Sequence, residues 1–266
     1  MINLHTNLAR RASGLVAASL LLTVSFTAHA AVVVDFETDG QGNTLSPGDI
    51  LTNTTIFNPG SSTEGVTFSV FNQGNAGNSN NGANPGAGIS TGIGDIFDIA
   101  NLNAGGNRDL ILFDADCNPS CTGQDPDLEL PGEGNILIIS EDNNSSDPDD
   151  SRFGGAVLVD FLPPVVNLNN LVIDFSDNNN QAPGDSFALA IFQGEVVGLF
   201  DFVAGLGDNN LQTANFGDIE VDQLLISIDS SGGIVSLEFT PVPVPAAVYL
   251  FATGLGMLGF AKRKKC

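Results

Sequence analysis

Short apolar runs, separated by polar and glycine-rich stretches, form the main pattern of this chain between residues 31 and 240. The runs are rich in Val, Ile, Leu and Phe, and the stretches between them contain Gly, Asn, Asp, Ser and Pro. This is the pattern of β-strands joined by turns. We predict ten strands, over Val32–Phe36, Val66–Phe71, Leu110–Phe113, Asn135–Ser140, Ala156–Leu162, Leu171–Phe175, Phe187–Phe192, Val196–Phe202, Leu224–Ile228 and Ile234–Phe239.

Several of these runs alternate between apolar and polar positions, which is typical of antiparallel strands that bury one face. Three faces predicted in this way are Val157, Val159 and Phe161; Leu171, Ile173 and Phe175; and Phe187, Leu189 and Ile191. Two glycine-containing stretches, Gln193-Gly194 and Ser230-Ser231-Gly232-Gly233, separate pairs of runs and predict hairpin turns. No stretch of residues 31–240 shows a sustained apolar period of 3.6 residues with helix caps. We therefore predict one all-β domain over residues 31–240, an antiparallel β-sandwich of jelly-roll-like type.

Residues 1–30 have the pattern of a secretory signal peptide. The basic pair Arg10-Arg11 precedes an apolar run over residues 12–26, and Ala28-His29-Ala30 follows it. Small residues at Ala28 and Ala30 suit cleavage by signal peptidase after Ala30. The alternative is an uncleaved membrane anchor, for which the apolar run is short.

Residues 241–266 contain a second membrane-directed pattern. Prolines at 241, 243 and 245 precede an uncharged apolar stretch over residues 246–261, which predicts a transmembrane helix of about 24 Å. Basic residues that follow a span keep the tail in the cytoplasm. The basic tail consists of Lys262, Arg263, Lys264 and Lys265. The alternative is a buried terminal helix of the globular domain, which leaves four consecutive bases unexplained.

This C-terminal arrangement resembles the PEP-CTERM sorting signal in its VPLPA-like variant. The sorting motif consists of Val242, Pro243, Val244, Pro245 and Ala246. The resemblance covers residues 241–265 only, and Val242 or Val244 stands where the motif has Glu. It implies recognition by an exosortase in the inner membrane of a Gram-negative bacterium that makes exopolysaccharide. It leaves open which exosortase variant reads the motif and where it cuts.

The charge of the chain is strongly asymmetric. Residues 31–240 contain 31 acidic residues and only Arg108 and Arg152 as bases, which gives a net charge of −29. Such a surface repels nucleic acid and anionic lipid headgroups. The same segment has no His, Lys, Tyr or Trp, which excludes Ser-His-Asp and Cys-His catalysis, lysine Schiff bases and histidine metal sites. We expect no enzymatic activity.

Acidic residues are concentrated in two predicted loops. The candidate metal ligands are Asp114, Asp116, Asp125, Asp127, Asp147, Asp149 and Asp150, with Glu129, Glu133, Glu141 and Asp142 beside them. Calcium takes six to eight hard oxygen ligands in flexible geometry and is available outside the cell, so it suits these loops better than magnesium. Two interpretations stay open: a calcium site, or acids that solvate the loops.

Cys117 and Cys121 flank a Pro-containing turn in a segment predicted to be exported. We predict a local disulfide, which stabilises modestly because the closed loop is small. The alternatives are free thiols or a metal pair.

These observations predict an exported, non-enzymatic surface or extracellular-matrix protein, tethered transiently in the inner membrane by its C-terminal helix. Its expected partners are signal peptidase, an exosortase and the exopolysaccharide of a biofilm matrix. A second hypothesis is a calcium-dependent glycan-binding adhesin. A distant third is a secreted glycoside hydrolase, which needs only a suitably spaced carboxylate pair.

Overall fold

The protein is described from a computed structural model, in which residues 30–51, 65–71, 110–116, 128–140, 144–150, 154–162, 165–175, 186–203, 206–207, 209–228 and 231–242 are described. Residues Ala30–Pro241 form one compact unit. Within the part of the chain that is described, no helix is long and apolar enough to cross a membrane. The predicted signal peptide and C-terminal helix lie outside this part.

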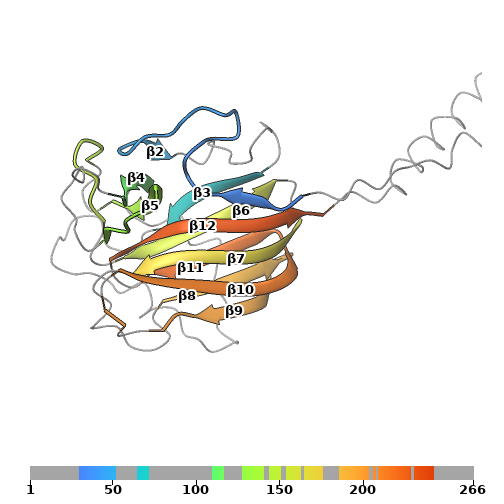
Figure 1. Ribbon diagram of the computed structural model, residues 1–266. Helices are drawn as coiled ribbons and strands as arrows, with labels where there is room; N and C mark the ends of the chain where they lie inside the picture. Colours follow the sequence, from blue (N-terminus) through green and yellow to red (C-terminus); the bar gives the residue numbers. More distant parts are fainter. Residues whose placement is uncertain are drawn as a thin grey trace, which may run out of the picture. The chain divides into compact units, whose positions relative to one another are not determined.

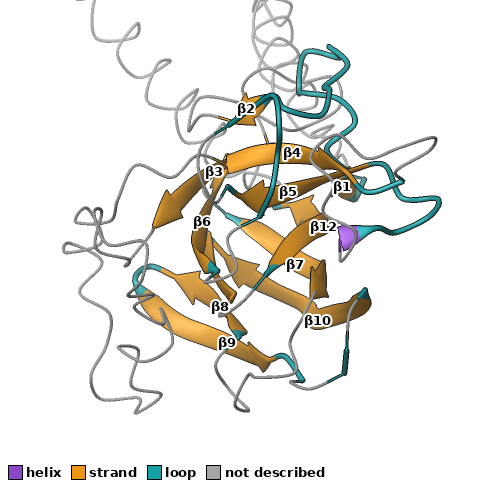
Figure 2. Cartoon of the chain, turned by 90° about the vertical axis from the view of Figure 1, so that its left-hand side faces the viewer, coloured by secondary structure: helices purple, strands orange, loops and turns teal. Residues whose placement is uncertain are grey.

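Two antiparallel sheets make up the compact unit (Figures 1 and 2). The seven-stranded sheet contains β1 (Val32–Val34), β2 (Ile50–Leu51), β4 (Leu110–Asp114), β5 (Asn135–Ile139), β7 (Val166–Phe175), β10 (Asn210–Val221) and β12 (Gly232–Pro241). The five-stranded sheet contains β3 (Gly65–Phe71), β6 (Gly155–Leu162), β8 (Phe187–Phe192), β9 (Glu195–Asp201) and β11 (Gln223–Ile228). The predicted all-β antiparallel sandwich is confirmed, and most consecutive strands change sheet, as jelly-roll-like connectivity requires.

Strand β12 lies at the centre of the larger sheet. One of its edges pairs with β7 along its whole length, and the other pairs first with β5 at Gly233 and Ile234 and then with β1 at Leu237–Phe239. β12 thus joins three strands that lie far apart in the sequence. Its packing is therefore set by tertiary contacts rather than by a neighbouring hairpin.

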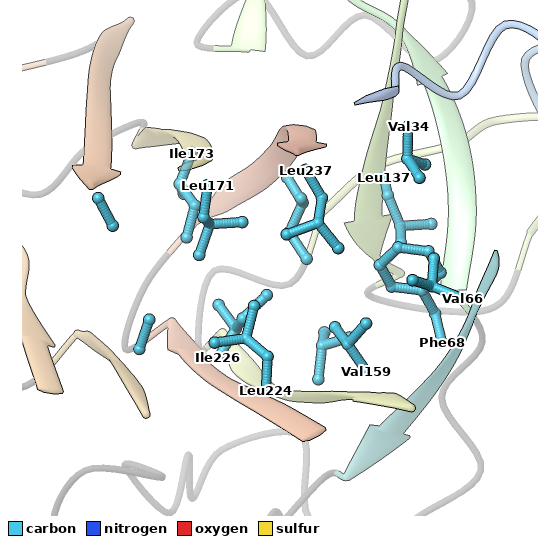
Figure 3. Close-up of a cluster of buried hydrophobic side chains, with 14 of the residues drawn as sticks. Val34, Val66, Phe68, Leu137, Val159, Leu171, Ile173, Leu224, Ile226 and Leu237 are labelled. Carbon is cyan, nitrogen blue, oxygen red and sulfur yellow. The ribbon is translucent and has the colours of Figure 1, made fainter. Parts of the chain in front are cut away.

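The main core lies between the two sheets (Figure 3). Leu171, Ile173 and Leu237 of the larger sheet face Leu224 and Ile226 of the smaller one, and all five are fully buried. Phenylalanine rings add to this layer. Among the described residues, buried pairs are Phe36–Phe68, with ring centroids 5.5 Å apart, Phe161–Phe239, at 5.3 Å, and Phe175–Phe202, at 5.2 Å. The predicted inward faces of β6 and β7 are confirmed.

A satellite apolar cluster covers the outer face of the larger sheet. Ile111 and Phe113 of β4 and Ile136 and Ile138 of β5 pack there against Leu128, Leu130, Ala115 and Val235. β4 and β5 are therefore buried on both faces, which explains why their sequences are almost continuously apolar.

The face of β8 that the sequence predicts to be buried points away from the main core. Phe187, Leu189 and Ile191 share a face as predicted, but Ala188 and Ala190 are the residues that face the main core. Leu189 and Ile191 instead join an outer cluster with Ala156, Leu158 and Leu225. The small inward alanines let the two sheets approach closely, while the large side chains form a second apolar layer.

One predicted hairpin is confirmed and the other is wrong. Gln193 (φ 53°) and Gly194 (φ 80°) both adopt the left-handed conformation that a two-residue turn of type I′ requires, and they join β8 to β9. The other predicted hairpin is not formed, because the strands that it would join, β11 and β12, belong to different sheets. Gly232 is instead needed for close packing: a Cβ there would lie 2.7 Å from the backbone oxygen of Asp174.

Two strands were not predicted. β2 has two residues. β10 has twelve, forms one edge of the larger sheet and pairs with β7 along its length. Six of its twelve residues are polar, and its pairing register shifts between Asn215 and Ile219, where Asp218 adopts a left-handed conformation (φ 64°). This irregularity interrupts the alternation by which a strand is recognised. The predicted strand Val32–Phe36 ends early, at Val34, because Phe36 is left-handed (φ 61°).

Candidate functional site

Four acidic loop segments lie together around strands β4 and β5. We call them the acidic loop surface and define it as the described residues 35–49, 114–116, 128–134 and 144–150. Its acidic residues are Asp35, Glu37, Asp39, Asp49, Asp114, Asp116, Glu129, Glu133, Asp147, Asp149 and Asp150. The described residues contain no Lys, Arg or His, so no basic side chain in that part of the chain neutralises them.

Hydrogen bonds connect the loop segments to one another. The backbone N–H of Asn135 donates to Glu37 Oε1 at 2.7 Å, and Asn135 Nδ2 donates to the carbonyl oxygen of Phe36 at 3.2 Å. The N–H of Gly132 donates to Asp116 Oδ1 at 2.8 Å. Segment 35–49 is thereby held against β5, and segment 114–116 against segment 128–134.

The turn over residues 46–49 connects two further parts of the surface. The N–H of Ser46 donates to Asp49 Oδ2 at 2.8 Å, and the N–H of Gly48 donates to the carbonyl oxygen of Leu112 at 2.8 Å. Gly48 is left-handed (φ 86°), and a Cβ there would lie 2.2 Å from the backbone oxygen of Ser145. Only glycine permits this approach of segments 35–49 and 144–150.

Asp150 is the most buried acid of the surface, with 6% of its area exposed. Its Oδ2 atom accepts hydrogen bonds from Ser231 Oγ at 2.6 Å and from the backbone N–H of Gly232. Ser140 and Asp150 also form an isolated antiparallel bridge. Asp150 therefore fastens the start of β12 to the end of β5.

Asp39 closes a tight turn in segment 35–49. Asn43 Nδ2 donates to Asp39 Oδ2 at 2.7 Å, and the N–H groups of Asn43 and Gln41 donate to Oδ1 at 2.8 and 2.9 Å. The side-chain bond from Asn43 is the main cause that lowers the pKa of Asp39 below its ordinary value of 3.8; burial opposes it, and the backbone bonds add to it.

Because this pKa is lowered by folding, the turn contributes stability above the unfolded pKa and loses it as the pH falls through the folded value. Replacing Asn43→Ala is expected to raise the pKa of Asp39 towards 3.8. The measurement is an NMR titration of the Asp39 carboxyl carbon, with Asn215→Ala on the exposed edge strand β10 as the control. An unchanged pKa in Asn43→Ala would contradict the assigned cause.

The structure places five of the seven predicted metal ligands. Asp114, Asp116, Asp147, Asp149 and Asp150 all lie on the acidic loop surface. Among the described residues, no three or more of His, Cys, Asp and Glu are grouped closely enough to hold a metal ion. Asp125 and Asp127 lie outside the described residues, as do Glu141 and Asp142. A calcium site therefore stays a prediction.

Most other predicted site residues also fall outside the described part. The cysteines Cys117 and Cys121, the signal-peptide residue Ala28, the motif residues Pro243–Ala246 and the basic tail Lys262–Lys265 belong to this group. Of the residues assigned to the two terminal signals, only Ala30, Pro241 and Val242 are described, just before β1 and at the end of β12.

Chemically, the acidic loop surface offers many carboxylate oxygens, and its described residues include no Lys, Arg or His. Several of these oxygens already accept backbone hydrogen bonds, as at Glu37, Asp39, Asp49, Asp116 and Asp150. This arrangement stabilises loops and produces a negative electrostatic field that attracts cations.

Sequence reasoning missed a second unusual surface. Val196, Val197 and Leu199 of β9 are about half exposed, at 50%, 46% and 55%. A strand of Val, Leu and Phe resembles a buried strand in sequence, so only the position of β9 at the edge of its sheet distinguishes it.

Comparisons with known proteins give weak matches among solved structures. No family model and no curated protein matches the chain. Among solved structures, a fucose-binding module of Streptococcus pneumoniae is 13% identical, covering 41% of this chain and 73% of the module, with a TM-score of 0.24. The family 32 carbohydrate-binding module of NanJ from C. perfringens, in complex with galactose, is 18% identical, covering 44% and 85%, with a TM-score of 0.26. Discoidin II of Dictyostelium discoideum is 12% identical, covering 40% and 48%, with a TM-score of 0.25. None of these overlaps carries ligand residues over to this chain.

Proposed function

We propose that this protein is an exported, non-enzymatic surface or extracellular-matrix protein. Its β-sandwich is carried to the cell surface by an N-terminal signal peptide and a C-terminal sorting segment. The tail holds the sandwich transiently in the inner membrane until an exosortase processes it. The sandwich then associates with exopolysaccharide outside a Gram-negative cell.

The observation that carries this proposal is the boundary at Pro241. The central strand β12 ends there, and the Val-Pro-Val-Pro-Ala motif begins at the next residue. The compact unit begins at Ala30, the predicted last residue of the signal peptide. A folded unit that lies in the sequence between two predicted targeting segments fits a cargo domain. The lack of His, Lys, Tyr and Trp in residues 31–240 supports a role without catalysis.

Processing at both ends is the test. The intact mass of the protein from the culture medium and from the cell envelope is expected to show loss of residues 1–30 and of part of 241–266. Replacing the basic tail, Lys262–Lys265, with serines is expected to leave the C-terminal segment uncut, because the charges that stop and orient the helix are gone. Replacing Arg108 and Arg152 with serine is the matched control and is expected to be processed normally. Full-length, uncut chain that is soluble in the cytosol would refute the proposal.

A second candidate is calcium-dependent glycan binding by the acidic loop surface. Its support is the convergence of four acidic segments with no described base among them. Polar loops that gather at one place are common sites of recognition.

If calcium binds, removing it with EDTA is expected to lower the melting temperature, because a ligand that binds only the folded state stabilises it. The variant Asp114→Asn with Asp116→Asn is expected to lose that response, and Glu195→Gln, on β9, is expected to keep it. A glycan array with and without chelator then tests recognition. A melting curve that EDTA leaves unchanged, together with no chelator-sensitive glycan, would exclude this candidate.

A further inference from the structure

The exposed large apolar side chains of the described residues gather mainly on one side of the sandwich. The group consists of Val196, Val197 and Leu199 on β9, Val203 and Leu206 after it, and Leu211 on β10, all between 46% and 57% exposed. We call this group the β9–β10 strip. Only Val33 and Ile50 among the described residues are comparable and lie elsewhere. β9 and β10 are the neighbouring edge strands of the two sheets (Figures 1 and 2).

The strip continues an apolar layer that crosses four of the five strands of the smaller sheet, β6, β11, β8 and β9. Leu158 of β6 pairs with Leu225 of β11, Leu225 with Leu189 of β8, and Leu189 with Leu199 of β9. The first two leucines of this row are at most 7% exposed, and Leu199 is 55% exposed. Val196 pairs with Ile191 of the same outer cluster. The row therefore ends in an aliphatic side chain that is exposed to solvent on the edge strand.

The edge of β9 is suited to receive another strand. Among the described strands, β9 pairs with β8 alone. Proteins protect such an edge with charged residues, especially lysine, with proline, or with a β-bulge. β9, with the sequence Glu-Val-Val-Gly-Leu-Phe-Asp, has no Lys or Pro; its acids stand only at its two ends, and the irregularity in its pairing with β8 lies between Val196 and Gly198. An added strand would continue the sheet and place its own side chains beside Val197 and Leu199.

The acidic residues at the two ends of β9 determine which kind of added strand can pair with it. Glu195 and Asp201, both exposed, stand at the two ends of β9. A second copy of the chain would bring the same carboxylates, and like charges opposite each other across two strands destabilise the pairing. In the register that places Gly198 opposite its own copy, Glu195 would face the Asp201 of the partner. A strand with basic residues at its ends would instead pair with both carboxylates.

We propose that the free edge of β9 is a docking site for an extended segment of another protein, with aliphatic side chains at alternate positions and Lys or Arg at its ends. The segment adds a sixth strand to the smaller sheet. Backbone hydrogen bonds to β9 provide affinity, the end of the leucine row selects aliphatic side chains, and Glu195 and Asp201 select the basic ends. This role is independent of the export route and of calcium.

The test uses the full chain in lipid nanodiscs and a synthetic peptide of alternating Val and Thr with Lys at both ends. Control peptides have Asp at both ends, or the same composition with the valines adjacent. Fluorescence anisotropy measures binding, and amide hydrogen exchange followed by mass spectrometry locates it. The variant Leu199→Asp removes the exposed end of the leucine row. Ile50→Asp changes a similarly exposed aliphatic residue (44%) on β2 and is the matched control.

The Lys-ended peptide is expected to bind, to protect the amides of residues 195–201 and to bind more weakly as salt is added. Leu199→Asp is expected to weaken it by about tenfold or more, as loss of an interface anchor does, whereas Ile50→Asp has little effect. Three results would overturn the proposal: no binding of the Lys-ended peptide, binding that leaves the β9 amides unprotected, or equal binding of the Asp-ended peptide. A dimer in sedimentation experiments that Leu199→Asp dissociates would assign the strip to a second copy of this chain instead.

Discussion

Replacing Phe239 with alanine is expected to destabilise the sandwich by about 3–5 kcal/mol, the range for removing a buried aromatic side chain. Phe239 lies in β12, is fully buried and packs edge-on against Phe161 of the facing sheet, with ring centroids 5.3 Å apart. The substitution removes this ring contact and leaves a cavity between the two sheets. Because β12 also pairs with β7, β5 and β1, the surrounding strands cannot collapse freely into the space.

Urea unfolding followed by circular dichroism measures this effect. In a domain of this size, a loss of 3–5 kcal/mol corresponds to a fall in Tm of about 6–20 °C. Leu206→Ala, at a side chain that is 52% exposed, is the control and is expected to change stability by less than about 0.5 kcal/mol. Equal stability of Phe239→Ala and the natural protein would mean that this layer is not the core.

Replacing Asp150 with alanine is expected to cost about 2–3 kcal/mol. The carboxylate accepts hydrogen bonds from Ser231 Oγ and from the N–H of Gly232, and both donors become buried without this acceptor when it is removed. Bonds to a charged acceptor are stronger than neutral ones, which places the expected loss above that of an ordinary hydrogen bond. The larger consequence is for the start of β12, which loses its attachment to the end of β5.

Two comparisons distinguish this role from a general effect of removing an acid. Asp147→Ala, on the same loop but exposed, is expected to leave the free energy of unfolding nearly unchanged. Ser231→Ala is expected to cost less than Asp150→Ala, because the bond from Gly232 remains. If Asp150→Ala unfolds at the same urea concentration as Asp147→Ala, the hydrogen bonds at Asp150 contribute little and its main role lies elsewhere, metal binding included.

The ten predicted strands are present because strand formation depends on local features. Val, Ile, Leu and Phe in short runs between turn residues favour extended backbone wherever the runs pack, and the Gln193-Gly194 turn depends on two adjacent residues only. β10 escaped prediction because an edge strand with one exposed face and an interrupted register needs few apolar residues. β10 is a strand because its backbone pairs with that of β7, and its own sequence does not indicate this pairing.

The acidic residues illustrate the limit of reasoning from residue type. Their concentration around residues 114–150 was visible in the chain, but Asp150 and Asp147 look equivalent there. One is buried and accepts two hydrogen bonds from the start of β12, and the other is exposed. The donors come from Ser231 and Gly232, more than eighty residues away in the sequence. A pattern over a few neighbouring residues cannot reveal a contact between residues so far apart in the sequence.

Composition and local periodicity alone were enough to establish an acidic chain with an all-β segment that lacks His, Lys, Tyr and Trp between residues 31 and 240, and to predict its export. Those properties depend on residue counts and on alternation over a few positions. The folded molecule decided which sheet each strand joined, that the large side chains of β8 point away from the main core, and that Leu199 ends a leucine row at an open edge. The physical reason is that these properties arise from contacts between strands distant along the chain, and only the packing of the two sheets brings such strands together.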